Sequence, residues 1–327
     1  MKIFVSAVML GSITVCVGIV HSADPPPRLP LLEPEAAWSR VVPTSEYPKL
    51  LPTWARILSG PMPKTTARML NLDALHRSGD RLDARLRCLA RWAAAEANGC
   101  RAMQAIVEAD WHRAGPFFED VGTLVSQSDR LPEIDRLVVQ FARKMQREAH
   151  AITDDEVHRL IQLLGEERMV ALVALLAHAS FQDRVFLALR LPTEGAEPLP
   201  PITVPIPSRA SRGSPPASPP PKPELPNLVA KDSSQWRELQ DGLQTQRRRV
   251  TRIQVPTKEA LAARMGPNHP GAWQLDIVWS RVCFGYQPEL TQAWFEMVST
   301  FREESQLKSL FANSIFWVVT QAVKCFY

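Results

Sequence analysis

The chain has 327 residues and a formal net charge of +4, with 45% hydrophobic and 22% charged residues. This composition is typical of a globular protein and supplies enough apolar material for a core. The small net charge excludes the strong overall field with which some proteins attract nucleic acid or an anionic membrane.

The first predicted element is a targeting segment. Lys2 is followed by the uncharged, mostly apolar run IFVSAVMLGSITVCVGIV and then by HSADPPP. This pattern predicts a secretory signal peptide over residues 1–22, cleaved after Ser22 or Ala23. An uncleaved anchor is the alternative, since the run is nearly long enough to span a bilayer. We expect an exported protein, periplasmic or extracellular, with no later segment that spans a membrane.

Residues 30–191 are predicted to form a helical unit. Within RLDARLRCLARWAAAEA, helical spacing places the apolar residues Leu82, Leu86, Leu89 and Ala93 on one face. Within LPEIDRLVVQFARKMQREA, the same spacing relates Ile134, Leu137, Val138, Phe141 and Met145. These patterns predict amphipathic helices.

The same unit continues with further helix signals. Thr153 and Glu156 have the spacing of a capping box that opens a helix. EERMVALVALLAHA and SFQDRVFLAL follow as apolar, helical segments, and no hairpin pattern occurs. The predicted fold class is therefore all-α.

A proline-rich boundary follows at residues 192–226, which contain 13 prolines in 35 residues. Proline lacks an N–H and fixes φ, so this stretch predicts an extended linker without helix or central strand. The second predicted unit covers residues 227–327.

The two units share a sequence pattern that predicts a tandem duplication. The tetrapeptide WSRV begins at both Trp38 and Trp279, and Pro48 and Pro288 each precede a tryptophan, Trp54 or Trp294, at the same distance. Continuing this alignment pairs EANGC, which ends at Cys100, with QAVKC, which ends at Cys325. This pairing requires about fifteen extra residues in the first copy, and we expect them to form a loop, SGPMPKTTARMLNL. We expect the second unit to be incomplete in this chain.

These pieces, in this order, resemble the carboxymuconolactone decarboxylase superfamily, which includes the AhpD-like alkylhydroperoxidases. The resemblance rests on EANGC and the helix after it, on residues 152–189, and on PELTQAWFEMVSTFR with FANSIFWVVTQAVKCFY. It implies two tandem AhpD-like helical units. It also implies thiol-dependent peroxidase chemistry, carried by a Cys-x-x-Cys at a helix start, a histidine shortly after it and a glutamate on the preceding helix.

That chemistry needs each of these groups. A helix N-terminus lowers the pKa of the first thiol, whose thiolate reduces a peroxide and becomes a sulfenic acid. The second cysteine resolves the sulfenic acid as a disulfide, while the histidine and glutamate relay the proton.

Set against this signature, the first unit is degenerate. Met103 stands where the resolving cysteine belongs, and Cys88 lies near the place of the glutamate. In the second unit Cys325 is present and Asn313 lies near the glutamate position. The candidate catalytic residues are therefore Cys325 and Cys100. Two alternatives remain open for Cys100: an inert buried thiol, or a disulfide with Cys88.

Other classes of site receive little support from the sequence. No histidine pair has the spacing of a helical zinc site, and His178 lies in an apolar run typical of a core residue. We expect no metal and no cofactor. The basic run RRRVTR at 247–252 is too short to indicate nucleic-acid binding. The tryptophans Trp38, Trp54, Trp279 and Trp294 are interpreted as packing anchors, and Cys283 as a core residue.

Two functions follow from the sequence. The first is an exported AhpD-like thiol peroxidase, weak or inactive in this chain, with a thiol reductant as partner. The second is a non-catalytic helical interaction protein derived from that fold. The resemblance also implies a homo-oligomer, and we expect no nucleic acid and no membrane bound after signal cleavage.

Overall fold

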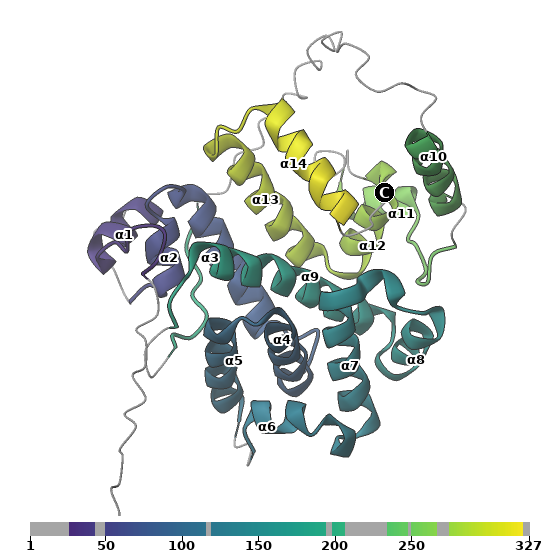
Figure 1. Cartoon of the computed structure of the whole chain (residues 1–327), viewed down its shortest axis with the longest axis horizontal. Coiled ribbons are helices and arrows are strands. Elements are labelled where there is room, and N and C mark those ends of the chain that lie inside the picture. Colours follow the sequence, from purple (N-terminus) through teal and green to yellow (C-terminus); the bar gives the residue numbers. More distant parts are fainter. Residues whose placement is uncertain are drawn as a thin grey trace, which may run out of the picture.

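The computed structural model describes residues 26–42, 50–115, 119–193, 198–206, 234–247, 250–266 and 275–322. These residues form fourteen α-helices and contain no β-strand, so the all-α prediction is confirmed (Figure 1). The predicted signal peptide lies outside the described residues, as do Cys325 and most of the linker.

The helices fall into two groups along the chain. The first group is α1 (Pro34–Val41), α2 (Thr53–Leu58), α3 (Pro63–Ser78), α4 (Ala84–Asn98), α5 (Arg101–Ala114), α6 (Val121–Ser126), α7 (Glu133–Glu148), α8 (Asp154–Leu164) and α9 (Glu166–Leu189). The second group is α10 (Ser234–Arg247), α11 (Lys258–Met265), α12 (Val278–Tyr286), α13 (Pro288–Glu304) and α14 (Ser309–Ala322).

Helix α4 is the centre of the first group. It packs against α5, α6, α7 and α9, which surround it in Figure 1. Leu86, Leu89 and Ala93 of the predicted apolar face are buried in α4, and Leu82 is buried just before the helix begins. Four alanines of α4 are buried and let the neighbouring helices approach closely. Asp83 accepts a hydrogen bond from the backbone N–H of Leu86 and begins the helix.

The predicted start signal of α8 is confirmed. The Thr153 hydroxyl accepts a hydrogen bond from the Glu156 backbone, and the Glu156 carboxylate accepts one from the Thr153 backbone. The two apolar segments predicted after α8 form one continuous helix, α9.

Helix α9 is long and apolar enough to cross a membrane by length and composition, which the sequence analysis did not expect of this segment. More than half of its apolar window is buried within the protein, where it contacts α4, α7, α8 and α12. These contacts are those of a central core helix.

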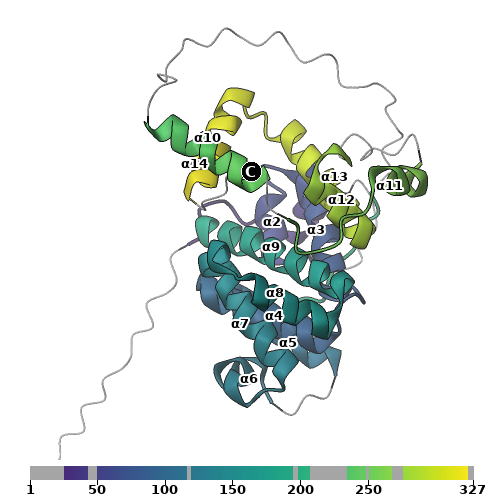
Figure 2. The same cartoon turned by 90° about the vertical axis from the view of Figure 1, so that its right-hand side faces the viewer.

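The second group lies on one side of the first. Helix α13 packs along α3, and α12 contacts α9, so that in Figure 2 α9 lies between the α4–α8 helices and the α12–α14 helices. Met297 of α13 is part of the main core, while Leu261, Leu275 and Phe284 form a small separate cluster.

Helices α13 and α14 repeat the spacing of α3 and α4. Pro63 and Pro288 each open the first helix of a pair, and α14 begins 225 residues after α4, as α13 does after α3. The hydroxyls of Thr66 and Thr291, at matching positions, both donate to a backbone carbonyl four residues earlier. The duplication itself remains a prediction.

This spacing corrects the predicted loop in the first copy. Most of SGPMPKTTARMLNL belongs to α3, a helix of sixteen residues. If the two groups are copies with this spacing, any extra residues of the first copy lie between α1 and α3, where α2 occurs, and Pro288 pairs with Pro63 in place of Pro48.

Part of the predicted linker is packed against the first group. In residues 198–206 the backbone N–H and carbonyl of Val204 both bond to the Asn71 amide, and the Val204 side chain is buried in the main core. This stretch contains no helix, as the prolines predict, but its described part is not a free spacer.

The tryptophans differ between the two groups. Trp38 and Trp54 are buried, as predicted for packing anchors. Trp279 and Trp294 are more than a third exposed and pack edge-to-face, with ring centroids 5.9 Å apart. Cys283, interpreted as a core residue, is half-buried.

Candidate functional site

Cys100 lies at the start of a helix, as the resemblance implies for a reactive thiol. Gly99 ends α4 with a left-handed φ of 71°, and this tight turn makes Cys100 the residue that precedes the first turn of α5. The nearby backbone N–H of Met103 favours the thiolate and so acts to lower the thiol pKa.

The surroundings of Cys100 raise the pKa of its thiol more than this position at the helix start lowers it. The residue is only 1% exposed, and burial, reinforced by the nearby Asp183 carboxylate, raises the pKa of its thiol to about 11. At pH 7 such a thiol is ionised in about one molecule in 10⁴. Met103, one turn further along α5, is equally buried and offers a thioether in place of a second thiol.

Cys88 is also buried, and the pKa of its thiol is also raised. It faces the interior from α4, and burial followed by the Asp110 charge raises the pKa of its thiol to about 12. Cys88 and Cys100 are both free thiols, so the alternative of a disulfide between them is wrong. Cys325, the other candidate nucleophile, lies outside the described residues.

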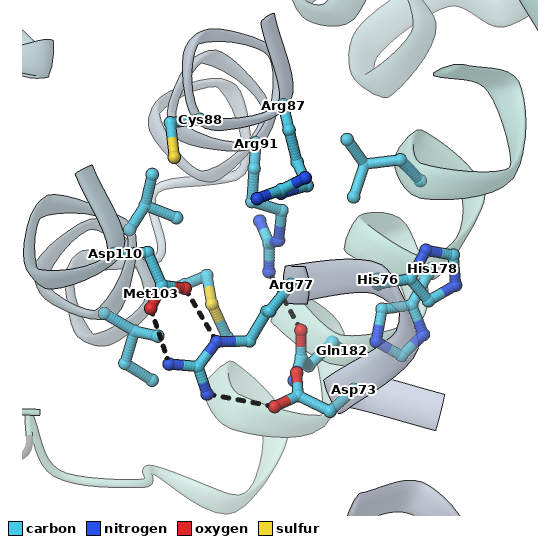
Figure 3. Close-up of a pocket in the computed structure, with 13 residues that line it drawn as sticks. Asp73, His76, Arg77, Arg87, Cys88, Arg91, Met103, Asp110, His178 and Gln182 are labelled. Carbon is cyan, nitrogen blue, oxygen red and sulfur yellow. Dashed lines mark hydrogen bonds and ion pairs between the residues drawn. The ribbon is translucent and has the colours of Figure 1, made fainter. Parts of the chain in front are cut away.

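A cluster of buried charged residues, which the sequence analysis missed, occupies the space beside Cys88 (Figure 3). Arg91 of α4 forms an ion pair with Asp183 of α9, and neither side chain is more than 7% exposed. Arg91 also donates to the Gln182 amide oxygen at 3.3 Å, and Gln182 donates to Asp73 at 2.8 Å. These contacts join α3, α4 and α9 through polar groups inside an otherwise apolar core.

Arg77 extends this cluster to α5. Its guanidinium donates two hydrogen bonds to Asp110, at 2.7 and 2.9 Å, and one to Asp73 at 3.1 Å. A fourth hydrogen bond, of 2.8 Å, is donated to the Leu199 carbonyl, in the described part of the predicted linker. The charged side chains of the cluster thus neutralise one another, and Arg77 holds the 198–206 stretch against α3.

Two histidines stack at the edge of the same cluster. The rings of His76 and His178 lie 4.2 Å apart at an interplanar angle of 11°, and both are buried (Figure 3). Burial, followed by the Arg91 charge, lowers the pKa of His178 to about 3. Neither ring nitrogen of His178 has a hydrogen-bond partner within the described part of the chain. His178 is thus a neutral core residue, in agreement with the interpretation from its apolar surroundings.

The cavity that these residues line is small. Its volume is about 20 Å³, which holds on the order of one water molecule. Cys88, Met103 and Val107 line its apolar wall, and Arg77, Arg91 and His178 its polar wall. A peroxide larger than hydrogen peroxide would need the helices to separate before it reached the Cys88 thiol through this cavity.

One further group of side chains has the composition of a metal site. Ligand atoms of Glu108, His112 and Asp120 lie within 4.8 Å of one another. His112 and Asp120 are exposed, and the His112 Nε2 atom lies 3.5 Å from the Glu108 carboxylate, one helical turn earlier. Exposed groups of this kind commonly occur without a metal, so the cluster carries no assignment.

The sequence contained one signal for the missed cluster. Arg91 stands among the buried positions of α4, and Gln182 and Asp183 stand in the second half of the long, apolar helix α9. Charged residues are rarely buried unless they are paired, so their place on buried helix faces predicts that each has a partner. Which residue is the partner becomes known only when the helices are brought together.

Comparison with models of protein families, with curated proteins and with solved structures found no match.

Proposed function

We propose that this chain is a non-catalytic helical binding protein, built on the fold of the AhpD-like thiol peroxidases that it resembles. The observation that carries the proposal is the burial of Cys88 and Cys100, whose thiol pKa values are raised to about 12 and 11. Thiolate, not thiol, is the nucleophile towards peroxide, so these two residues act as structural groups.

The buried polar cluster supports the same conclusion. Its arginines and carboxylates are paired with one another and leave a space for about one water. Such a cluster fixes how α3, α4, α5 and α9 pack, which is a structural role.

The proposal includes export, because Lys2 and the apolar run after it have the pattern of a secretory signal. Sequencing the N-terminus of the protein recovered outside the cytoplasm would test this part. The expected first residue is Ala23 or Asp24, whereas retention of residues 1–22 would indicate a membrane anchor.

A one-cysteine peroxidase is the second candidate, and the position of Cys100 at the start of α5 favours it. In that reaction the Cys100 thiolate would attack one oxygen of the peroxide and become a sulfenic acid, as the O–O bond breaks and the other oxygen leaves as water or an alcohol. A separate thiol reductant would then restore the thiol in two steps, through a mixed disulfide.

Thiol reactivity separates the two functions. The purified chain is treated with equimolar hydrogen peroxide at pH 7 in the presence of dimedone, which labels sulfenic acids. The mass of each cysteine-containing peptide is then determined by mass spectrometry. We expect no adduct at Cys88 or Cys100 within minutes, and complete alkylation of both by iodoacetamide after denaturation. Cys325→Ser serves as the control that removes any contribution from Cys325. Rapid labelling of Cys100, abolished by Cys100→Ser, would establish the peroxidase instead.

A further inference from the structure

A second cavity lies where the two helix groups meet. Its volume is about 90 Å³, and it is bordered by the end of α3, the start of α4, the first half of α9 and the start of α13. Such a volume holds roughly three waters, and it is smaller than the cavity of about 150 Å³ that holds benzene. His76, Arg87 and Leu175 also line the cavity beside Cys88, so the two cavities adjoin (Figure 3).

Arg87 brings a charge without a counter-ion to this second cavity. Its side chain is half-buried, and its Nη1 atom donates to the backbone carbonyls of Gly79 and Leu82. Within the described residues no carboxylate forms an ion pair with it. The Nε and Nη2 atoms of Arg87 therefore keep donor capacity for an anion.

The other charges around the cavity are exposed to water. Arg81 pairs with Glu167, and both side chains are about half exposed. Asp80 and Glu289 are exposed as well, so water and salt screen their repulsion of an anion. An anion inside the cavity would thus interact mainly with Arg87.

His76 contributes a buried polar group that has no partner. Its ring is stacked on His178, is only 8% exposed and makes no hydrogen bond within the described part of the chain. Burial, followed by the neighbouring His178, lowers the pKa of His76 well below its usual value, so the ring is neutral at pH 7 and carries one N–H donor. A buried polar group without a partner is destabilising, and a bound ligand that accepts this hydrogen bond would remove the penalty.

The start of α13 also favours a negative group. The Gln287 side chain precedes this helix but donates to the Glu167 carbonyl, and no side chain caps the first turn. Leu290, in that turn, lines the cavity. The free N–H groups and the dipole at a helix N-terminus stabilise an anion nearby.

The rest of the lining is apolar. It includes Leu75, Leu82, Ala171, Leu175 and Leu290. A phosphate or sulfate would bring more charge than Arg87 neutralises and would lose hydration against these leucines. A monocarboxylate with a short hydrocarbon chain matches both the polar and the apolar side.

We propose that this cavity binds a short-chain carboxylate, whose oxygens accept hydrogen bonds from Arg87 and His76 while its hydrocarbon chain packs against the leucines. The volume limits the ligand to roughly four carbons. The inference rests on the proposed binding function and names its ligand class.

The test is equilibrium dialysis of the purified full chain against radiolabelled butyrate at pH 7. We expect one butyrate to bind per chain with a Kd of about 1 mM or below, which six non-hydrogen atoms can supply. 1-Butanol keeps the hydrocarbon chain without the charge, and it should compete at least ~10-fold less effectively than unlabelled butyrate.

Two variants test the position of the ligand. Arg87→Gln removes the charge and should raise the Kd for butyrate at least ~10-fold, because charge-assisted hydrogen bonds are the strong ones. Ala171→Leu fills the cavity without changing any charge and should raise the Kd by at least the same factor, ~10-fold. Arg159→Gln, at a half-exposed arginine of α8, is the matched control and should bind butyrate as the unsubstituted chain does. Circular dichroism establishes that each variant is folded.

Three outcomes would overturn the inference. The first is no saturable binding of butyrate up to ~10 mM. The second is a Kd that both Arg87→Gln and Ala171→Leu leave unchanged, which would place butyrate elsewhere. The third is 1-butanol competing as well as butyrate, which would show that no carboxylate is recognised.

The outcome for this site and the outcome for the proposed function are separable. Rapid peroxide labelling of Cys100 in a chain that still binds butyrate would defeat the non-catalytic function and leave the carboxylate site standing. Unreactive thiols in a chain that binds no butyrate would defeat the carboxylate site alone.

Discussion

Arg91 and Asp183 form an ion pair that water does not reach, since Asp183 is fully buried. Removing one partner leaves the other charge uncompensated in a medium of low polarity. We expect Arg91→Met to lower the free energy of unfolding by about 3–5 kcal/mol, measured by urea denaturation. A loss below about 1 kcal/mol would mean that the pair is solvated in solution.

Two further variants test whether burial is the cause. Arg159→Ala removes an ion pair with Glu133 whose side chains are about half exposed, and should cost no more than about 1 kcal/mol. The double variant Arg91→Met/Asp183→Leu removes both charges and should recover most of the lost stability, because no unpaired charge remains.

His178 gives the protein a dependence on pH. Its pKa is lowered to about 3 by burial and by Arg91, with His76 stacked on the ring and Asp73 beside His76. The unfolded chain binds a proton at His178 near pH 6.5, whereas the folded chain does so only near pH 3. Stability contributed by this group is therefore present above pH 6.5 and falls by up to ~1.4 kcal/mol per pH unit as the pH drops towards 3.

The measurement is urea unfolding at several pH values between 4 and 7. We expect His178→Leu to flatten the slope over this range, because the leucine binds no proton in either state. His158→Leu replaces an exposed histidine and should leave the slope unchanged. Equal slopes for the unsubstituted chain and His178→Leu would contradict the buried, neutral state of His178.

At the scale of the element, α8 begins at a capping box whose hydrogen bonds are both present. Thr153→Ala removes the side-chain acceptor for the Glu156 backbone N–H and should cost about 1 kcal/mol in thermal or urea unfolding. Thr153→Ser keeps the hydroxyl and should cost much less. If both variants lost the same stability, the β-methyl group and its packing would be responsible instead of the cap.

The whole molecule depends on the packing of α13 along α3. The Glu304 carboxylate accepts hydrogen bonds from the backbone N–H groups of Lys64 and Thr65, at 3.0 and 2.7 Å, and so caps α3 from a residue about 240 positions away. Arg68 and Glu296 pair across the same interface. A carboxylate at a helix N-terminus is stabilised by the free N–H groups and the helix dipole.

We expect Glu304→Ala to loosen this interface, because two N–H groups of α3 lose their acceptor. Hydrogen exchange of the α13 amides should become about 10-fold faster, which corresponds to ~1.4 kcal/mol, while the α4 amides should exchange as before. Glu259→Ala, at an exposed glutamate of α11, is the control. Acceleration spread evenly over α4 and α13 would show that the two helix groups unfold together.

The sequence by itself determined the helical class, the apolar face of α4 and the capping box of α8. Each depends on residues three or four apart in the chain, and local spacing fixes such contacts whatever the rest of the molecule does. The loop predicted at residues 59–72 came instead from the alignment of the two copies, which needed extra residues in the first. Most of this stretch is helical, because Pro63 is acceptable in the first turn of a helix and opens α3.

Only the tertiary structure decided the state of the candidate site. Cys100 has the helix-start position that would activate a thiol, yet its pKa is set by burial and by Asp183, which is 83 residues away in the sequence. Arg91 and Asp183 could be read as surface charges until α4 and α9 came together. The exposure of the apolar side chains of α14 is also decided by tertiary structure. Both α4 and α14 are rich in apolar residues, but within the described residues only α4 is surrounded by other helices.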